Sequence, residues 1–200
     1  SNDIAQPDST FKAPAKMDIG NAPVTNFESS AYSATTLKMA TAKSINTVFG
    51  QVAVKLGPQR LVAQAGKFGF DKKIPYELPV LTSLMPDPSE MTTWETAWSG
   101  IGQPVGEHAS PAGPQATVFQ MALVASGLAN DGKVMKPYVI SEIGGKSSSG
   151  ILSTTKGSVL TTACSPSVAN EVTDAMKAVV KVGSGRGAAL SGVEVAGKTG

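Results

Sequence analysis

The stretch Val193-Glu-Val-Ala-Gly-Lys-Thr-Gly200 carries the clearest chemical signature of the sequence. Its two valines alternate with Glu194, which is the pattern of a half-buried β-strand. The strand is predicted to run into Lys198-Thr199, with a glycine on either side. Lysine offers a point charge, threonine a short hydroxyl donor on a stiff β-branched side chain, and the glycines let a ligand lie along the strand edge. The stretch therefore predicts a strand that binds a carboxylate.

The same residues also match a phosphate-binding loop, G-x-x-x-x-G-K-[ST], because Gly192 lies five residues before Gly197. Such a loop needs small residues that cradle the phosphate and a helix that follows at once. Here the intervening Val-Glu-Val-Ala is a strand pattern with a carboxylate where the phosphate would lie, and no helix follows within the chain. The carboxylate-binding strand is therefore favoured over the phosphate loop.

The composition is that of an ordinary soluble domain, or of most of one. Of the 200 residues, 41% are apolar and 16% are charged, which is enough to form a substantial core. The net charge of +2 gives no reason to expect nucleic acid or a membrane surface as a partner. No apolar run is long enough to span a bilayer, and no signal peptide is evident. Cys164 is the single cysteine, so an internal disulfide is excluded.

Upstream of the C-terminal stretch, the chain divides into a polar connector and a helix-rich domain. Residues 1–30 are rich in turn-forming residues and show no helical period, so we expect an extended connector on the surface. Residues 31–200 are expected to form the domain. Helical patterns predict helices at 35–43, 48–56, 59–70, around 90–98, at 117–128 and from 166 to 183. A strand is predicted at 134–143, with weaker strand character up to residue 162. The fold class is therefore α+β.

Capping signals mark the starts of three of these helices. Ser165 is a good N-cap with Pro166 at the first helical position. Thr117 with Gln120 has the spacing of a capping box. Asn46 is a candidate N-cap for the helix at 48–56, which gives this residue a structural interpretation beside any functional one.

Several short motifs, taken in order, resemble the transpeptidase domain of penicillin-binding proteins over about residues 20–200. Each is short, whereas the ordered set is specific. The residues within these motifs are most similar to those of the class B enzymes, in particular the actinobacterial PbpA-like group. The motifs are Ser44-Ile45-Asn46, Ser99-Gly-Ile-Gly-Gln103, Phe119-Gln-Met-Ala122 with Ala129-Asn-Asp-Gly132, Met135-Lys-Pro-Tyr138, Gly183-Ser-Gly-Arg-Gly-Ala188 and Lys198-Thr199-Gly200.

This resemblance implies a penicillin-binding protein/serine β-lactamase-like fold, of which residues 31–200 would form a partial domain: most of the helical subdomain and the clamp strand. It also implies a D,D-transpeptidase, in which a serine attacks the carbonyl between two D-alanines and a neighbouring stem-peptide amine then takes the acyl group. By the same resemblance, Ser44 would relay a proton and Asn46 would hold the substrate amide and the base lysine. Lys198 and Thr199 would bind the terminal carboxylate, and backbone just beyond Gly200 would complete the oxyanion hole.

The resemblance further implies the setting of this chemistry. The partners would be a peptidoglycan stem peptide ending in D-Ala-D-Ala, β-lactam antibiotics and a cell-wall synthesis complex, without nucleic acid. The protein would act at the extracytoplasmic face of the bacterial cell membrane, with the anchor outside this chain. No cofactor and no metal are implied, and the single histidine, His108, has no partner at ligand spacing.

The nucleophile is the point at which the chain departs from the family. The only S-x-x-K is Ser9-Thr-Phe-Lys12, and Pro14 lies where a second helical turn would have to propagate. In related enzymes a Pro-Asp-Ser-Thr-Phe stretch occurs downstream of the nucleophile helix, and Pro7-Asp-Ser-Thr-Phe11 fits that place better. We therefore expect the nucleophile to precede Ser1 and this polypeptide by itself to be an inactive fragment.

Three other functions stay open on the sequence. A serine β-lactamase shares the fold, but the E-x-x-L-N pattern of the class A enzymes is absent around Glu77, Glu90 and Glu95. A β-lactam sensor domain keeps the same motifs. A non-catalytic cell-wall scaffold would use the fold for docking only. Labelling by a fluorescent penicillin separates them: transpeptidase and sensor predict a stable adduct, lactamase predicts turnover, and scaffold predicts none.

The remaining conspicuous residues receive structural interpretations. Trp94 and Trp98 are four apart on a short helical piece, which favours packing over substrate stacking. Cys164 is expected to be a small buried or turn residue. Arg186 precedes the C-terminal stretch and either helps to shape the carboxylate site or is a solvated arginine in a turn.

Overall fold

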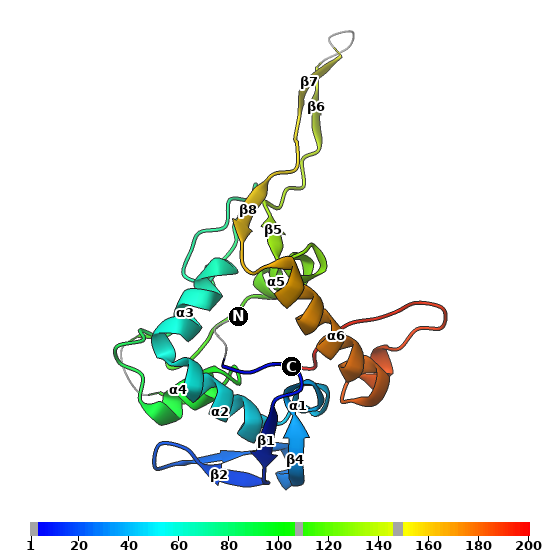
Figure 1. The fold of residues 1–200 in the computed structure, drawn as a ribbon. Helices are drawn as coiled ribbons and strands as arrows, with labels where there is room; N and C mark the ends of the chain where they lie inside the picture. Colours follow the sequence, from blue (N-terminus) through cyan, green and yellow to red (C-terminus); the bar gives the residue numbers. More distant parts are fainter. Residues whose placement is uncertain (1–3, 107–109, 146–149) are drawn as a thin grey trace.

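The computed structural model describes residues 4–106, 110–145 and 150–200. The mixed helix and strand class expected from the sequence is confirmed (Figure 1). The N-terminal part contains β1 (Thr10–Ala13), β2 (Lys16–Asp18), β3 (Pro23–Thr25), η1 (Phe27–Ser29) and β4 (Tyr32–Thr36). The helical centre contains α1 (Leu37–Lys43), α2 (Asn46–Leu56), α3 (Pro58–Lys67), α4 (Thr93–Ser99) and α5 (Val118–Ala129). The remainder contains β5 (Lys133–Met135), β6 (Glu142–Gly144), β7 (Ile151–Thr154), β8 (Val159–Thr162), α6 (Pro166–Val182) and η2 (Arg186–Ala188).

Strands between Thr10 and Thr36 form two small antiparallel sheets beneath the helices (Figure 1). β1 pairs with β4, and β2 pairs with β3. Phe11, Ala13 and Val24 alternate inward from these strands and are buried against α1, α2 and α4. These strands therefore contribute side chains to the core, which the sequence interpretation of residues 1–30 as a surface connector did not foresee.

The helices form the centre of the molecule, and their ends follow local signals. Ser165 caps α6 by accepting a hydrogen bond from the Val168 N–H, and Pro166 opens the helix, as predicted. Thr117 caps α5 by accepting from the Gln120 N–H, but the Gln120 side chain donates to the Phe68 carbonyl instead of completing a capping box. None of the helices in the described part of the chain is long and apolar enough to cross a membrane.

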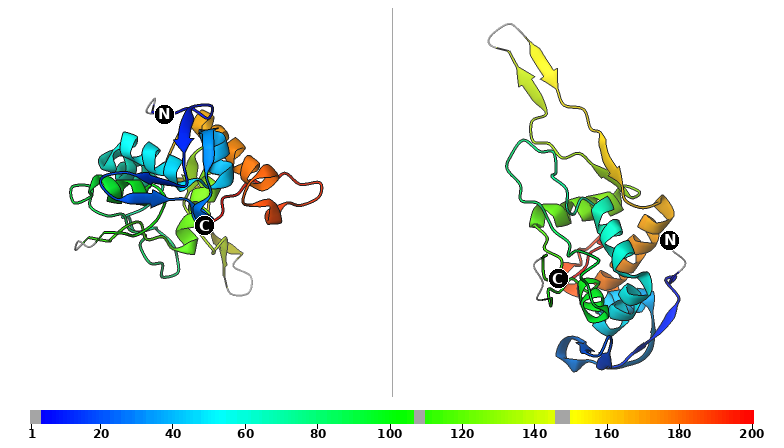
Figure 2. Two further views of the ribbon diagram at one scale, coloured as in Figure 1. Left: turned by 90° about the horizontal axis from the view of Figure 1, so that it is seen from below. Right: turned by 90° about the vertical axis from the view of Figure 1, so that its left-hand side faces the viewer.

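The strand predicted at 134–143 is wrong as a single element, because the chain divides it into two short strands. β5 pairs with β8, and β6 pairs with β7 in a hairpin that extends far from the helices (Figures 1 and 2). Pro137 lies between β5 and β6, where it has no N–H to donate to a ladder. Ile143 and Ile151 of the hairpin are more than half exposed, so this arm contributes little to the core.

The strand predicted at Val193–Val195 is also wrong. Among the described residues, only an isolated bridge joins Leu190 to Val193, and residues 194–200 lie in extended backbone without a strand partner. Alternating valines are compatible with a strand, but a strand also requires a neighbour that accepts and donates backbone hydrogen bonds, and Val193 is 60% exposed here. The segment lies along α6 instead, where the Gly197 N–H donates to the Met176 carbonyl at 3.3 Å.

Candidate active site

Ser44 stands at a tight turn between α1 and α2. α1 ends at Lys43, and Ser44 adopts the left-handed conformation, with φ 55° and ψ 51°. The Ser44 N–H donates a hydrogen bond to the Thr41 carbonyl, and the Ile45 N–H donates to the Ala40 carbonyl. A left-handed residue other than glycine costs on the order of 1 kcal/mol or more, and such strain is concentrated at functional sites. The turn therefore uses strained backbone to present a serine hydroxyl.

Two buried side chains, those of Ile45 and Asn26, support this turn. Ile45 is 1% exposed and packs with Phe11 and Val48. The predicted N-cap role of Asn46 is wrong, because Ile45 is the N-cap and Asn46 is the first helical residue. The cap is supplied from elsewhere in the chain: the Asn26 side-chain oxygen accepts from the Thr47 N–H at 2.9 Å. The Asn46 amide nitrogen donates to the Thr25 carbonyl at 2.9 Å, which leaves its amide oxygen as an acceptor for another group.

Lys198 reaches the Ser44 turn from the other end of the chain. Its ammonium group donates to the Ser44 hydroxyl at 2.7 Å and to its neighbouring carbonyl, that of Thr199, at 2.8 Å. Partial burial lowers the pKa of the Lys198 ammonium below its ordinary value. The hydroxyl of Thr199 lies 2.7 Å from the hydroxyl of Ser184. Lys198 thus contacts the Ser44 hydroxyl directly, and the next residue of the segment, Thr199, pairs its hydroxyl with that of Ser184.

The segment that carries Lys198 is fastened to α6 by few contacts. Lys177 of α6 makes an ion pair with Glu194 at 2.9 Å and a second with Asp174 at 3.4 Å. The hydrogen bond to Glu194, followed by that to Asp174, raises the pKa of the exposed Lys177. Gly200 is exposed at the end of the segment, with open space on the side where a Cβ would stand.

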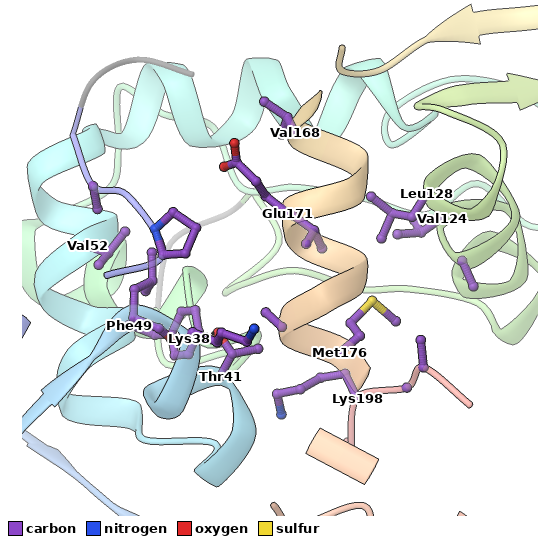
Figure 3. Close-up of a pocket in the computed structure, with 18 of the residues that line it drawn as sticks. Lys38, Thr41, Phe49, Val52, Val124, Leu128, Val168, Glu171, Met176 and Lys198 are labelled. Carbon is purple, nitrogen blue, oxygen red and sulfur yellow. Dashed lines mark hydrogen bonds between the residues drawn. The ribbon is translucent and has the colours of Figure 1, made fainter. Parts of the chain in front are cut away.

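An apolar pocket of about 720 Å³ opens beside these groups (Figure 3). Its walls come from the chain before β1 and from α1, α2, α5, α6 and the C-terminal segment, and Lys198 lines it with Gly197. Helix side chains that line it include Phe49, Val52, Val124, Leu128, Val168 and Met176, all labelled in Figure 3. Such a pocket can hold an apolar side chain or helix next to the polar groups of Ser44 and Lys198.

A family model described as the penicillin-binding protein transpeptidase domain matches residues 1–200. The chain belongs to this family.

Known structures and relatives agree with this assignment. The D,D-transpeptidase domain of a peptidoglycan glycosyltransferase from Eggerthella lenta is 42% identical and superposes with a TM-score of 0.96 over 100% of this chain and 49% of that chain. Penicillin-binding protein A from M. tuberculosis, as an imipenem acyl-enzyme complex, is 28% identical with a TM-score of 0.85, over 98% of this chain and 44% of that chain.

The curated relatives point the same way. The peptidoglycan D,D-transpeptidase PbpA of Mycolicibacterium smegmatis is 34% identical over 164 residues, which are 82% of this chain and 31% of that protein. The chain therefore spans about a third of the length of that relative and about half of the structural neighbours.

Within this penicillin-binding protein domain, the structure brings together most of the residues that the motifs single out. Ser44, Lys198 and Thr199 lie in one hydrogen-bonded group, although 154 residues separate Ser44 from Lys198. Asn46 is two residues from Ser44, and its amide nitrogen is bonded to the backbone of Thr25. Gly200 follows Thr199 at the exposed end of the group. Within the described ranges, the guanidinium of Arg186 makes no hydrogen bond or ion pair, as expected of a solvated arginine in a turn.

The Ser9–Lys12 match does not form a catalytic pair. Ser9 immediately precedes β1, and Lys12 lies within that strand, so the two residues are not one helical turn apart on a common helix face. The hydroxyl of Ser9 accepts from the Gln6 N–H at 2.8 Å, and its carbonyl accepts from the Leu37 N–H. The prediction that this stretch opens no helix is confirmed.

The other residues considered in the sequence are explained structurally or lie outside the described part. Trp94 and Trp98 pack edge to face, with ring centroids 6.5 Å apart, against the cluster around Ile19. Glu95 completes the capping box of α4. Burial raises the pKa of the Cys164 thiol.

His108 lies outside the described residues. Over residues 4–106, 110–145 and 150–200, no cluster of three His, Cys, Asp or Glu side chains could hold a metal ion.

Sequence reasoning missed Asn26, Ser184 and the pocket. Ser184 belongs to a glycine loop in which Arg186 drew attention because of its charge. Asn26 lies in a polar turn, where asparagine is common for local reasons. Neither has a motif of its own; each acquires its role from contacts with residues remote in sequence.

Proposed function

We propose that this chain is part of a D,D-transpeptidase that cross-links peptidoglycan stem peptides through a serine acyl-enzyme, and that it supplies the proton relay and the carboxylate site. The observation that supports this proposal most directly is the 2.7 Å hydrogen bond between the Lys198 ammonium and the Ser44 hydroxyl, beside an apolar pocket. Two motifs that are remote in sequence meet there in the arrangement that acyl transfer requires.

The first half-reaction divides between these groups. The terminal carboxylate of D-Ala-D-Ala binds to the Lys198 ammonium and the Thr199 hydroxyl. An acylating serine gives its proton to the lysine of its own S-x-x-K motif and attacks the carbonyl between the two D-alanines. The C–N bond breaks, and the leaving amine takes a proton from the Ser44 hydroxyl. Ser44 regains a proton from Lys198, whose lowered pKa makes this transfer easier than from an ordinary lysine, and the proton taken up by the base lysine replaces it on Lys198.

The second half-reaction transfers the acyl group. The amine of a neighbouring stem peptide attacks the ester carbonyl, the C–O bond breaks, and the serine leaves with a proton. A substrate amide N–H is held by the Asn46 amide oxygen, which stays available because the Asn46 nitrogen is the atom bonded to Thr25.

The acylating serine is placed on an apolar helix that fills the pocket. The pocket is lined chiefly by aliphatic side chains, such as Val52 and Leu128, and Lys198 also lines it. A helix with an S-x-x-K sequence presents its serine and lysine on one face, and its apolar faces would cover these walls. Ser9 is unsuited to the role because the residues that follow it form a strand and not a helix.

The biological setting follows from this chemistry. Stem peptides are assembled into peptidoglycan outside the cytoplasm, so the active site is placed at the extracytoplasmic face of the bacterial membrane. β-Lactams carry a carboxylate and a strained amide, and they would occupy the same site as the D-Ala-D-Ala end. Contacts with other proteins of cell-wall synthesis belong to the same proposal.

Mass spectrometry with benzylpenicillin tests the proposal. The full-length protein, incubated with excess antibiotic, is expected to gain the mass of one benzylpenicillin on a serine outside residues 1–200, located by peptide mapping. A Ser9→Ala variant should form the adduct as the wild type does. An adduct on Ser9 would overturn the placement of the nucleophile, rapid release of hydrolysed antibiotic would indicate a β-lactamase, and a folded protein without any adduct would indicate a scaffold.

A further inference from the structure

We propose that Ser184 is a positioning residue, which fixes the Thr199 hydroxyl for carboxylate binding and sets the separation between the two halves of the site. The inference rests on the proposed function and gives a role to a serine of the Gly183–Ala188 motif, to which the resemblance assigns none. It is carried by one geometric observation: Ser184 contacts both halves, one through its backbone and the other through its side chain.

The backbone contact joins Ser184 to the helix that presents Ser44. The Ser184 N–H donates to the carbonyl of Ala42 at 2.9 Å, two residues before Ser44. Beside it, the ammonium of Lys43 donates to the Val182 carbonyl at 3.1 Å. Two hydrogen bonds of opposite direction therefore join the end of α6 to the last turn of α1.

The neighbouring glycines show how tightly the chain packs at this junction. A Cβ at Gly183 would lie 1.9 Å from the Ala42 carbonyl oxygen, and one at Gly185 would lie 2.9 Å from a methyl group of Val179. Both glycine N–H groups donate to the Val179 carbonyl, at 3.1 and 3.0 Å. Ala42 is fully buried, so neither side can move away. These contacts on both neighbours of Ser184 restrict where its backbone can lie.

The side-chain contact places the Ser184 hydroxyl 2.7 Å from the Thr199 hydroxyl. When the Ser184 hydroxyl donates to the Thr199 hydroxyl, the Thr199 hydrogen is free to donate to a bound carboxylate. The Ser184–Thr199 bond and the Thr199–carboxylate bond then polarise and strengthen one another. Without Ser184, the Thr199 hydroxyl on its lightly held segment loses this constraint. Removing one such hydrogen bond costs roughly five- to tenfold in an affinity or a rate.

The test compares a substrate with a carboxylate and one without. Acylation rates of the full-length protein are measured with benzylpenicillin and with its methyl ester. Ser184→Ala is expected to slow the reaction with benzylpenicillin by roughly five- to tenfold and the reaction with the ester by less than twofold. Ser184→Thr keeps the hydroxyl and should retain most of the rate. Ser191→Ala, at an exposed serine in the following turn, is the matched control and should change neither rate.

Three outcomes separate this inference from the function on which it rests. Equal loss with both substrates, or no loss with either, would overturn the positioning role while wild-type acylation upholds the transpeptidase function. If the wild type forms no adduct, the proposed function fails. The positional claim is then decided by hydrogen exchange in the full-length protein: Ser184→Ala should speed exchange in the peptide containing Thr199, whereas an unchanged rate would refute it.

Discussion

The Ser44 turn and the Val193–Gly200 segment meet in one hydrogen bond, yet the protein holds them in different ways. The turn is fixed from beneath by the buried side chain of Ile45 and by the Asn26 cap on α2. The segment has no strand partner among the described residues and depends on side-chain and single backbone contacts with α6 and its following loop. Substitutions beneath the turn should therefore affect stability most, and substitutions along the segment should affect ligand binding most.

The largest effect is expected where the two regions join. Ser44→Ala removes the hydroxyl that links Lys198 to the leaving amine, and loss of a positioned proton-transfer group costs on the order of 10²-fold or more. Stopped-flow fluorescence, which monitors acylation of the full-length protein by benzylpenicillin, measures this loss of rate. A rate within threefold of wild type would remove Ser44 from the mechanism.

Ser44→Gly separates function from backbone strain at the same position. Both variants lose the hydroxyl, but glycine adopts the left-handed conformation freely, so the glycine variant should be about 1 kcal/mol more stable than the alanine variant. Urea unfolding of the two proteins gives the difference. Equal stabilities would show that the turn stores no strain.

The next largest effect concerns the support beneath the turn. Asn26 is 6% exposed; its oxygen accepts from Thr47, and its nitrogen donates to the carbonyls of Pro14 and Ser30. Asn26→Ala removes all three bonds and leaves the buried Thr47 N–H without its cap, which should lower the free energy of unfolding by about 3 kcal/mol. Denaturant titration measures the loss.

Asn130 provides the matched control for this change. It is an exposed asparagine whose amide nitrogen donates to the Lys133 carbonyl at 3.0 Å. Asn130→Ala should cost well under half as much as Asn26→Ala, because water replaces the lost bond at an exposed site. If both substitutions cost the same, the order of the Ser44 turn does not come from the buried amide.

A smaller, pH-dependent effect belongs to Lys198. Its pKa in the folded protein lies below the 10.5 of an ordinary lysine, because partial burial penalises the cation. As the pH rises through this lowered pKa, the carboxylate site loses its charge, so acylation by benzylpenicillin should fall before pH 10.5. Lys198→Arg, whose guanidinium stays charged, should move this fall to higher pH. A wild-type rate that holds up to pH 10.5 would contradict the assignment.

The contribution of Lys198 to the stability of the fold should rise with pH, whereas acylation falls. Between the folded and unfolded pKa values the unfolded chain binds more protons at Lys198, so this residue makes the protein more stable as the pH rises and less stable below its folded pKa. Lys198→Met removes the penalty. At pH 7.5 the free energy of unfolding of the variant should be slightly higher than that of the wild type, and this difference should shrink towards pH 10.5. The difference is small because the residue is partly exposed.

The same contrast explains what could be read from the sequence. The helix starts at Ser165 and Thr117 were predictable because a cap acts within three residues of chain. Lys198 was singled out by its local stretch and Ser44 by the ordered motifs, but no local pattern predicts their contact, since they are 154 positions apart. The motif interpretation of Ser44, Asn46, Lys198, Thr199 and Gly200 as site residues stays a prediction for the experiments above.

Two failures came from the same cause. The strand expected at Val193–Val195 needs a neighbour with free backbone groups, and the alternation of side chains does not reveal whether one exists. The cap on α2 comes from Asn26, which is 21 residues away from Thr47, so Asn46 appeared to be the cap because it is local. Contacts made across the chain override local preferences at the places where the site is assembled.

The smallest effect is expected from the ion pair that joins the C-terminal segment to α6. Lys177 and Glu194 lie on the surface, where solvent screens the attraction, so Glu194→Gln should leave the melting temperature unchanged within error. It should also return the raised pKa of Lys177 towards its ordinary value, because Glu194 is the main cause of the rise. NMR titration of the lysine measures this shift. If the substitution instead abolishes acylation, the surface pair sets the position of Lys198, and the segment is held by charge and not by the Ser184 and Met176 contacts.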